Sequence, residues 1–277
     1  MPRPPGSKPT VALVYHGAYY RSSGKCADFF QAAYNHKTMI VDPLKRERSV
    51  NVITAFHTYS SGCHKRDNAL IDFLQPVAHE VEECCRPRIV DSYIRSLELL
   101  QASRVTVDWI VLTRFEIMFI SPLTQLNLNW GRINFGFRDS WNYWNSMHIV
   151  TDLFYLFPIS RMNDMISALD MSGTVDHSWA GSGHFTWSII DERFGGGAWH
   201  FISDIHSTSA LDGWLCNPHN WVPFYILRNC PDTACTDTPS IGRCTSDAAD
   251  GPKWGGDYTD AGLSRTNGLD LDPPPAF

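Results

Sequence analysis

The chain has 277 residues, of which 43% are hydrophobic and 19% are charged, and its formal net charge is −6. This composition is typical of a globular protein that is long enough for one large α/β domain, with or without a small appendage. The negative charge argues against a general electrostatic contact with nucleic acid, so we expect no nucleic-acid partner.

The two ends of the chain differ from the middle in composition. Residues 1–9 are rich in proline and lack the apolar core of a secretory signal, so we interpret them as a flexible leader. Residues 10–232 form the predicted domain, and residues 233–277, rich in Asp, Gly, Thr, Ser and Pro, are predicted to be a loosely packed or disordered tail. No apolar run approaches the roughly 20 residues that span a bilayer, so we expect a cytoplasmic protein without a transmembrane segment.

The first predicted element is a buried strand over Thr10–Tyr15, where β-branched and apolar residues follow the leader. It ends in the glycine-containing loop His16–Gly24, and a helix is expected over Cys26–Tyr34. A strand, a loop and a helix in this order can bind phosphate through backbone N–H groups and the helix N-terminus. The loop lacks the G-x-G-x-x-G and Walker patterns, so a plain strand-to-helix turn is the alternative.

The next segments continue an alternation of strands and helices. Apolar residues at helical spacing predict a helix over Ile89–Ala102, with Ser92 and Arg95 on one face. The other predicted elements are a strand at Asn51–Phe56, the loop His57–Gly62, a helix at Asp67–Leu74 and a strand at Val77–Glu82.

The polar end of the next strand is the predicted centre of the site. Trp109–Leu112 is a short apolar run of strand formers that opens into Thr113, Arg114, Phe115 and Glu116. Ligands of open α/β sheets bind at the carboxyl ends of the strands. Arg114 and Glu116 are two residues apart, so on extended backbone their side chains point to the same side. They could contact one phosphate–metal group, or they could form a salt bridge without a ligand.

After Pro122 the pattern is less regular. Aromatic residues in the loop Trp141–Trp144 suit either a sugar-stacking platform or a lid packed on the core. The other predicted elements are an edge strand at Ile133–Phe137, a strand entered through Asp152 at Asp152–Pro158, a helix at Arg161–Met171, a helix within Gly181–Phe194, a strand at Trp199–Ser203 and an irregular segment at Asn217–Arg228.

The eight cysteines fall into two groups. Cys26, Cys63, Cys84 and Cys85 are scattered and are expected to be reduced. Four late cysteines could form a zinc site with His219, one or two disulfides, or remain free thiols, and their spacing does not match paired zinc knuckles; they are Cys216, Cys230, Cys235 and Cys244. The chain also lacks a nucleophile-elbow pattern, which argues against a serine or cysteine hydrolase.

Several short motifs in a fixed order resemble one family. They are Val14–Arg21 with its His-Gly…Arg loop, Phe56–Tyr59, Ser92–Leu97, Asp108–Glu116, Asp152–Phe154 with Phe157-Pro158, and the later His184. This order resembles the GT-A-type glycosyltransferase-like proteins of large algal DNA viruses, algae and capsule-type sugar clusters. The resemblance covers about residues 10–228 and implies a GT-A-like (Rossmann-like) α/β/α sandwich with a mixed, mostly parallel central sheet.

The resemblance also implies a set of site residues. In that family an Arg-x-Asp stands at the strand end, and this chain has Glu116 in place of the Asp, with a longer side chain. It implies that Glu116 and His184 bind Mn²⁺ or Mg²⁺, and that Asp152 or Asp139 is the general base. The nucleotide sugar would contact His16, Gly17, Arg21, His57, Thr58, Arg95 and Arg114.

Three functions are therefore compatible with these residues. The first is a metal-assisted glycosyltransferase with a nucleotide-sugar donor and a glycan or glycoprotein acceptor, located in the host-cell cytoplasm if the chain is viral. The second is a catalytically degenerate transferase fold that binds carbohydrate or has a structural role. The third is a metal-dependent nucleotidyl or phosphoryl enzyme on a similar sheet.

Overall fold

A computed structural model describes residues 6–21, 27–62, 64–83, 88–137, 150–175, 183–203 and 224–226. All structural statements below refer to these residues. No helix among them is both long enough and apolar enough to cross a membrane.

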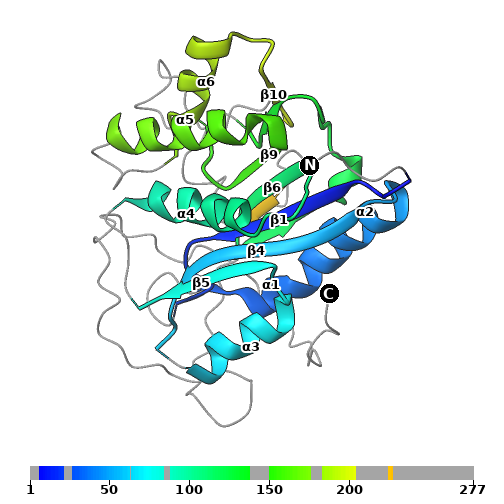
Figure 1. Cartoon of the computed structure of the whole chain (residues 1–277), viewed down its shortest axis with the longest axis vertical. Helices are drawn as coiled ribbons and strands as arrows, with labels where there is room; N and C mark the ends of the chain where they lie inside the picture. Colours follow the sequence, from blue (N-terminus) through cyan, green and yellow to red (C-terminus); the bar gives the residue numbers. More distant parts are fainter. Residues whose placement is uncertain are drawn as a thin grey trace, which may run out of the picture.

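A seven-stranded sheet forms the centre of the molecule (Figure 1). Its strand order is β10-β8-β9-β6-β1-β4-β5, and β9 alone runs antiparallel to the other six. The strands are β1 (Thr10–His16), β4 (Asn51–Tyr59), β5 (Ala78–Glu82), β6 (Trp109–Arg114), β8 (Ile133–Phe135), β9 (Phe154–Pro158) and β10 (Trp199–Phe201). The predicted mixed, mostly parallel sheet is confirmed.

Strand β1 lies inside the sheet, between β6 and β4, and both of its faces are covered. All seven of its residues are buried, and it pairs in parallel with β4 on one side and β6 on the other. Alternate residues enter two separate cores: Val11, Leu13 and Tyr15 enter one, and Ala12 and Val14 enter the other. A continuous apolar run is the pattern expected of a strand buried on both faces.

Helices cover both faces of the sheet, which makes three layers (Figure 1). One face is covered by α4 (Ile89–Ala102), α5 (Met162–Val175) and α6 (Thr186–Phe194). The other is covered by α1 (Phe29–His36), the π-helical turn η1 (Lys37–Val41), α2 (Asp42–Glu47) and α3 (His64–Leu74). Two short 3₁₀ turns complete the described helices, η2 (Leu123–Gln125) and η3 (Ile159–Arg161).

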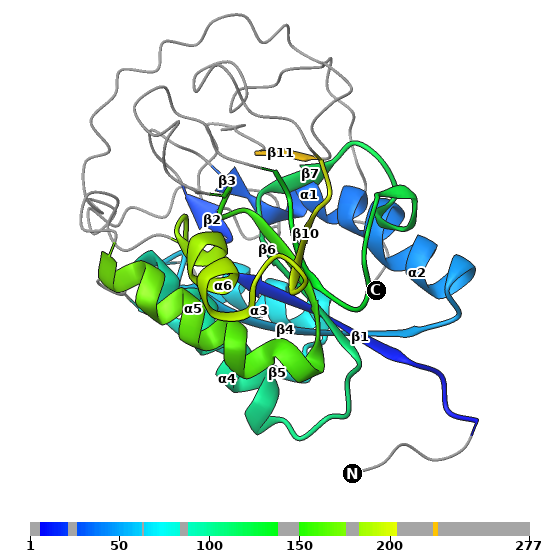
Figure 2. The ribbon, with the colours of Figure 1, turned by 90° about the horizontal axis from the view of Figure 1, so that it is seen from above.

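Two small antiparallel pairs lie outside the main sheet. β2 (Tyr20–Arg21) pairs with β3 (Ala27–Asp28), and β7 (Ile117–Phe119) pairs with β11 (Phe224–Ile226). Figure 2 shows both pairs close to α1. They extend the loops that follow β1 and β6.

Three sequence expectations are corrected. The segment Ile133–Phe137 was predicted to be an edge strand, but β8 lies between β10 and β9 because the late strand β10 pairs outside it. The predicted helix Cys26–Tyr34 begins at Phe29, after the strand β3. The irregular segment Asn217–Arg228 contains β11, whose partner β7 could not be identified from local sequence.

Candidate functional site

Four ionisable side chains lie side by side at the carboxyl ends of the parallel strands. His16 of β1 pairs in register with Arg114 of β6, and His57 of β4 pairs with Glu80 of β5. Because Tyr15 pairs with Phe56, His16 also stands beside His57. Residues in register on neighbouring parallel strands point to the same face, so we call Arg114, His16, His57 and Glu80 the polar row.

The polar row faces helix α4. In β1 the alternate residues Ala12 and Val14 pack in one core with Val90, Tyr93 and Leu97 of α4, and His16 continues that alternation. Apolar residues fill this side of the sheet up to its carboxyl edge, where charged and imidazole groups replace them. The polar row therefore lies at the carboxyl edge of the sheet, where α/β proteins bind ligands. We call this edge the polar edge.

Arg114 and Glu116 form a buried ion pair at this edge. The side chain of Arg114 is 15% exposed and that of Glu116 is 3% exposed. Burial alone would lower the pKa of Arg114, but the negative charges of Glu116 and Asp152 outweigh it, and the pKa is raised. The two side chains meet as expected, although Phe115 and Glu116 lie in a turn and not on extended strand.

Asp152 brings a second carboxylate to Arg114 from the neighbouring strand. It precedes β9, whose residue Phe154 pairs with Thr113, so the antiparallel strand begins where β6 ends. Asp152 is buried, and within the described ranges its Oδ1 has no hydrogen-bond partner. Its backbone oxygen accepts a 2.5 Å hydrogen bond from the Tyr93 hydroxyl. A buried carboxylate oxygen without a donor is costly, which marks this position as a candidate for ligand contact.

His16 is another buried side chain at this edge with polar atoms that lack a hydrogen-bond partner. Both of its ring nitrogens lack a partner among the residues that the structure describes, and its ring stacks on Tyr93 with centroids 3.4 Å apart. Burial lowers the pKa of His16 well below its usual value, and the nearby Arg114 and His57 lower it further. His16 is therefore neutral at pH 7 and can both donate and accept one hydrogen bond.

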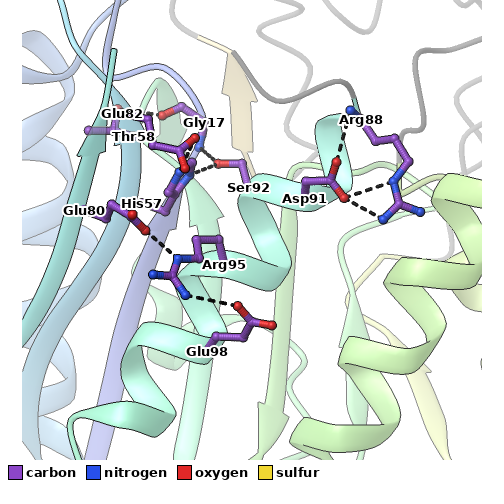
Figure 3. A network of polar contacts seen from close by, with 10 residues as sticks. All are labelled: Gly17, His57, Thr58, Glu80, Glu82, Arg88, Asp91, Ser92, Arg95 and Glu98. Atoms are coloured by element: carbon purple, nitrogen blue, oxygen red, sulfur yellow. Dashed lines mark hydrogen bonds and ion pairs between the residues drawn. The ribbon is translucent and has the colours of Figure 1, made fainter. Parts of the chain in front are cut away.

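Side chains from two elements hold the turn after β1 (Figure 3). The Gly17 N–H donates to Ser92 Oγ at 2.8 Å, and Thr58 Oγ1 donates to the Gly17 carbonyl at 2.8 Å. The Tyr19 N–H donates to Thr58 Oγ1 at 3.3 Å. Gly17 has φ = 81°, a conformation that glycine adopts without strain. The N–H groups of Gly17 and Tyr19 are thus already used within the protein.

A buried carboxylate fixes the same turn from its other side. Asp67 of α3 accepts hydrogen bonds from the hydroxyls of Tyr19, Ser60 and Ser61, and from the Ser61 N–H. Burial alone would raise the pKa of Asp67, but these donors outweigh it and the pKa is lowered. The Asp67 carboxylate therefore ties the turn after β1 to the turn after β4.

A group of possible metal ligands lies at the β5 end of the polar row. Ligand atoms of His57, Glu80 and Glu82 all lie within 4.8 Å of one another, and within the described part of the chain they are the one such group of three. His57 Nε2 is 3.2 Å from Glu82 Oε2, and Arg95 Nε donates to Glu80 Oε2 at 2.5 Å. Arg95, predicted to bind the donor, thus pairs with Glu80 and with Glu98 (Figure 3).

Ser92, His57 and Glu82 have the composition of a hydrolase triad, but their arrangement does not fit one. The Ser92 hydroxyl lies 2.8 Å from His57 Nδ1, but Ser92 is buried and its oxygen already accepts the Gly17 N–H. A nucleophilic serine must be open to its substrate. Ser92 instead connects α4 to the turn after β1 and orients the His57 ring.

The other residues predicted for the site lie outside the polar row or outside the described residues. His184 is buried, and its Nδ1 is 2.8 Å from the carbonyl oxygen of Val150, two residues before Asp152. Arg21 ends β2. Asp139, the loop Trp141–Trp144, all eight cysteines and residues 233–277 lie outside the described residues. The assignments of Glu116 and His184 to metal, and of Asp152 and Asp139 to general base, stay predictions.

A polar groove of about 570 Å³ lies between α4 and α5. The two arginines that line the groove are already ion-paired. Arg88 pairs with Asp91 and Asp170, and Arg95 pairs with Glu80 and Glu98. A ligand there would have to break these pairs, so we place the candidate site at the polar edge of the sheet.

Sequence reasoning missed the contributions of β5 and Asp67. Glu80 and Glu82 alternate along β5, a pattern that puts both carboxylates on one face, but it does not reveal that His57 is their neighbour. Asp67 was assigned to a helix without a role. Asp67 lies six and seven residues after Ser61 and Ser60, too far for a local turn pattern to reveal the contact.

The sequence matches no family model and no curated protein. Among solved structures, one that it resembles is a glycosyltransferase involved in the glycosylation of the major capsid of PBCV-1, with 10% identity over 81% of this chain and 95% of that chain and a TM-score of 0.43. Another is the apo-form glycosyltransferase GlyE of Streptococcus pneumoniae TIGR4, with 9% identity over 70% of this chain and 45% of that chain and a TM-score of 0.39. Both are glycosyltransferases. At these identities and TM-scores the likeness carries no argument about function, which has to come from the site.

Proposed function

We propose that this protein is a glycosyltransferase that moves a sugar from a nucleotide-sugar donor to a hydroxyl of a glycan or glycoprotein acceptor. The observation that supports the proposal most is the polar edge of the sheet. There the buried cation Arg114 lies beside His16, whose two ring nitrogens lack hydrogen-bond partners among the described residues, and beside Asp152, whose Oδ1 lacks one. A bound ligand with phosphate and hydroxyl groups would satisfy all three.

Each group has a role that its chemistry allows. A departing nucleoside diphosphate gains negative charge, and the guanidinium of Arg114 is suited to bind it with two parallel hydrogen bonds. Neutral His16 would donate to a phosphate or ribose oxygen. Gly17, Thr58 and His57 would shape the turn beside the donor, and Arg21 and Arg95 stay proposed donor contacts.

The transfer step needs a group to take the proton from the acceptor. The acceptor oxygen forms a bond to the anomeric carbon while the bond to the diphosphate breaks, and the hydroxyl proton leaves. For inversion of configuration we propose Asp152 as the base, with Asp139 as the second candidate. For retention neither carboxylate is required in this role.

A divalent ion, Mn²⁺ or Mg²⁺, would neutralise part of the diphosphate charge when bound. Glu116 and His184 were predicted to hold it, but the Glu116 carboxylate contacts Arg114 and the His184 ring contacts the Val150 carbonyl. Within the described ranges neither side chain belongs to a group of three possible metal ligands. We therefore derive no step through an ion at Glu116.

A second candidate function is a transferase fold that binds carbohydrate without catalysis. The ion pair between Arg114 and Glu116 favours it, because this cation is already neutralised by the protein itself. Glycan binding that persists without metal and nucleotide, and without turnover, would support this alternative.

The proposal is tested by incubating the protein with a panel of sugar nucleotides, Mn²⁺ and a glycan array, and by measuring nucleoside diphosphate release and product mass. We expect release with at least one donor, and a loss of release in Arg114→Lys, which keeps the positive charge but not the two-pronged geometry for the diphosphate. An absence of turnover, together with no thermal stabilisation by any sugar nucleotide, would contradict it. Products formed from a nucleoside triphosphate would indicate a nucleotidyl or phosphoryl enzyme instead.

A further inference from the structure

His57, Glu80 and Glu82 form a group at the β5 edge of the sheet. His57 is fully buried, whereas the side chains of Glu80 and Glu82 are 31% and 25% exposed. An ion could therefore reach the carboxylates from solvent, while the imidazole forms the closed inner side of the group.

Helix α4 orients two of the three side chains. The Ser92 hydroxyl lies 2.8 Å from His57 Nδ1, which leaves Nε2 directed at Glu82, 3.2 Å from its Oε2. Arg95 donates to one oxygen of Glu80, and a carboxylate has a second oxygen to offer. Metal-binding histidines and carboxylates are held in this way by hydrogen bonds from outside the ligand set.

The strand pairing explains why these three ligands meet. Glu80 is the in-register partner of His57, and Glu82 lies two residues further along β5, on the same face. Two carboxylates so close together repel each other, and Arg95 contacts Glu80. A cation between them and the imidazole would remove this repulsion.

We propose that His57, Glu80 and Glu82 form a binding site for a divalent first-row transition-metal ion, separate from the donor site at Arg114. One imidazole nitrogen and two carboxylate oxygens suit Mn²⁺ or Zn²⁺ better than Mg²⁺ or Ca²⁺, which prefer oxygen ligands alone. Three protein ligands leave further coordination positions open to water or to an anionic ligand. The ion would bind in the absence of nucleotide.

The test uses Mn²⁺ as the probe, because the cysteines of the chain would compete for Zn²⁺. Binding to the full-length protein without nucleotide is followed through the electron paramagnetic resonance signal of free Mn²⁺. The variants are Glu82→Gln and Glu80→Gln. The matched control is Glu98→Gln, which also removes a carboxylate from Arg95 but lies outside the ligand group.

We expect one Mn²⁺ per wild-type chain, with affinity lowered at least about tenfold in Glu82→Gln and Glu80→Gln. Glu98→Gln and Glu116→Gln should bind as the wild type does, and excess Mg²⁺ should not displace the Mn²⁺. Circular dichroism of each metal-free variant confirms that it folds. If either Glu80→Gln or Glu82→Gln does not fold, the other variant still tests the site.

Three results would overturn the proposal. One is wild-type affinity in both amide variants, and another is a loss of binding in Glu116→Gln alone, which would place the ion at Arg114 and Glu116. The third is weak binding of several ions without saturation, which would indicate adventitious contacts only. None of these results depends on turnover. The metal site can therefore be disproved while the proposed glycosyl transfer stands, and the transfer can be disproved while the metal site stands.

Discussion

The backbone N–H of Gly17 donates a hydrogen bond to Ser92 Oγ at 2.8 Å, across 75 positions of sequence. Through this contact helix α4 holds the turn that follows the first strand. The same Ser92 oxygen lies 2.8 Å from His57 Nδ1, so one hydroxyl fixes both the turn and a residue of the polar row.

Replacing Ser92 with alanine should therefore loosen the turn. The change leaves the Gly17 N–H and His57 Nδ1 without this partner, and an unsatisfied buried group costs about 1–3 kcal/mol. We expect a lower free energy of unfolding and weaker nucleoside diphosphate binding, with partial rescue by Ser92→Thr. Urea denaturation and isothermal titration calorimetry measure the two effects.

Ser96→Ala is the matched control for this prediction. Ser96 lies one turn further along α4, is also buried, and donates only to the Tyr93 carbonyl in the hydrogen bonds found for it. Its loss should affect stability but not ligand binding. Equal ligand affinities in the two alanine variants would show that Ser92 does not position the turn.

Phe115 anchors the strand end from the opposite face. Its fully buried ring stacks on Tyr15 with centroids 4.9 Å apart and packs edge-on against Phe29 at 5.3 Å. Phe115→Ala should lower the free energy of unfolding by about 3–5 kcal/mol, because a large cavity forms. Phe115→Leu fills most of that space and should cost less. If urea denaturation shows that Phe115→Ala lowers the free energy of unfolding by less than about 1 kcal/mol, the surrounding residues close the cavity without strain.

His36 makes stability depend on pH. It is fully buried between the Tyr15 hydroxyl and the Ile117 carbonyl, and burial lowers its pKa to about 4. The unfolded chain binds a proton near pH 6.5, so stability is full above that pH and falls as the pH drops from 6.5 toward 4. The loss is on the order of 3 kcal/mol by pH 4.

Urea denaturation at a series of pH values measures this loss. His36→Gln lacks the ionisable ring, and we expect its stability to depend less on pH over the same interval, even though the variant is less stable at pH 7. Parallel pH profiles of the wild type and His36→Gln would refute the assignment to His36.

Asp152→Asn should separate catalysis from binding. The amide keeps the size of the side chain but cannot accept a proton, and loss of a general base lowers turnover by about 10²–10⁴-fold. The affinity for the donor should change little. The control is Asp164→Asn, a carboxylate that pairs with Arg161 within one helical turn. Full turnover of Asp152→Asn would assign the base to another group, or to none.

The sequence predicted those elements that local periodicity determines. The helix Ile89–Ala102 has its predicted bounds, and the spacing of Arg114 and Glu116 placed their side chains on one side. The helical segment from Lys37 to Glu47 was missed, because it begins with a π-helical turn and contains Pro43.

The relations between distant segments could not be predicted in the same way. The contact between His57 and Glu80 depends on the register of β4 against β5, and the polar row depends on the order of all four of its strands. Asp67 reaches Tyr19 across 48 positions. Such contacts follow from the three-dimensional fold, and no local pattern encodes them.

The central claim is that Arg114 binds a diphosphate at the carboxyl edge of the sheet. Calorimetric titration with nucleoside diphosphates and Mn²⁺ tests it most directly, in the wild type, in Arg114→Lys, which keeps the charge but not the two-pronged geometry, and in the surface control Arg161→Gln. The account predicts saturable binding to the wild type and the control, and at least about tenfold weaker binding to folded Arg114→Lys. Equal affinity in all three proteins, or no binding to any of them, would contradict it.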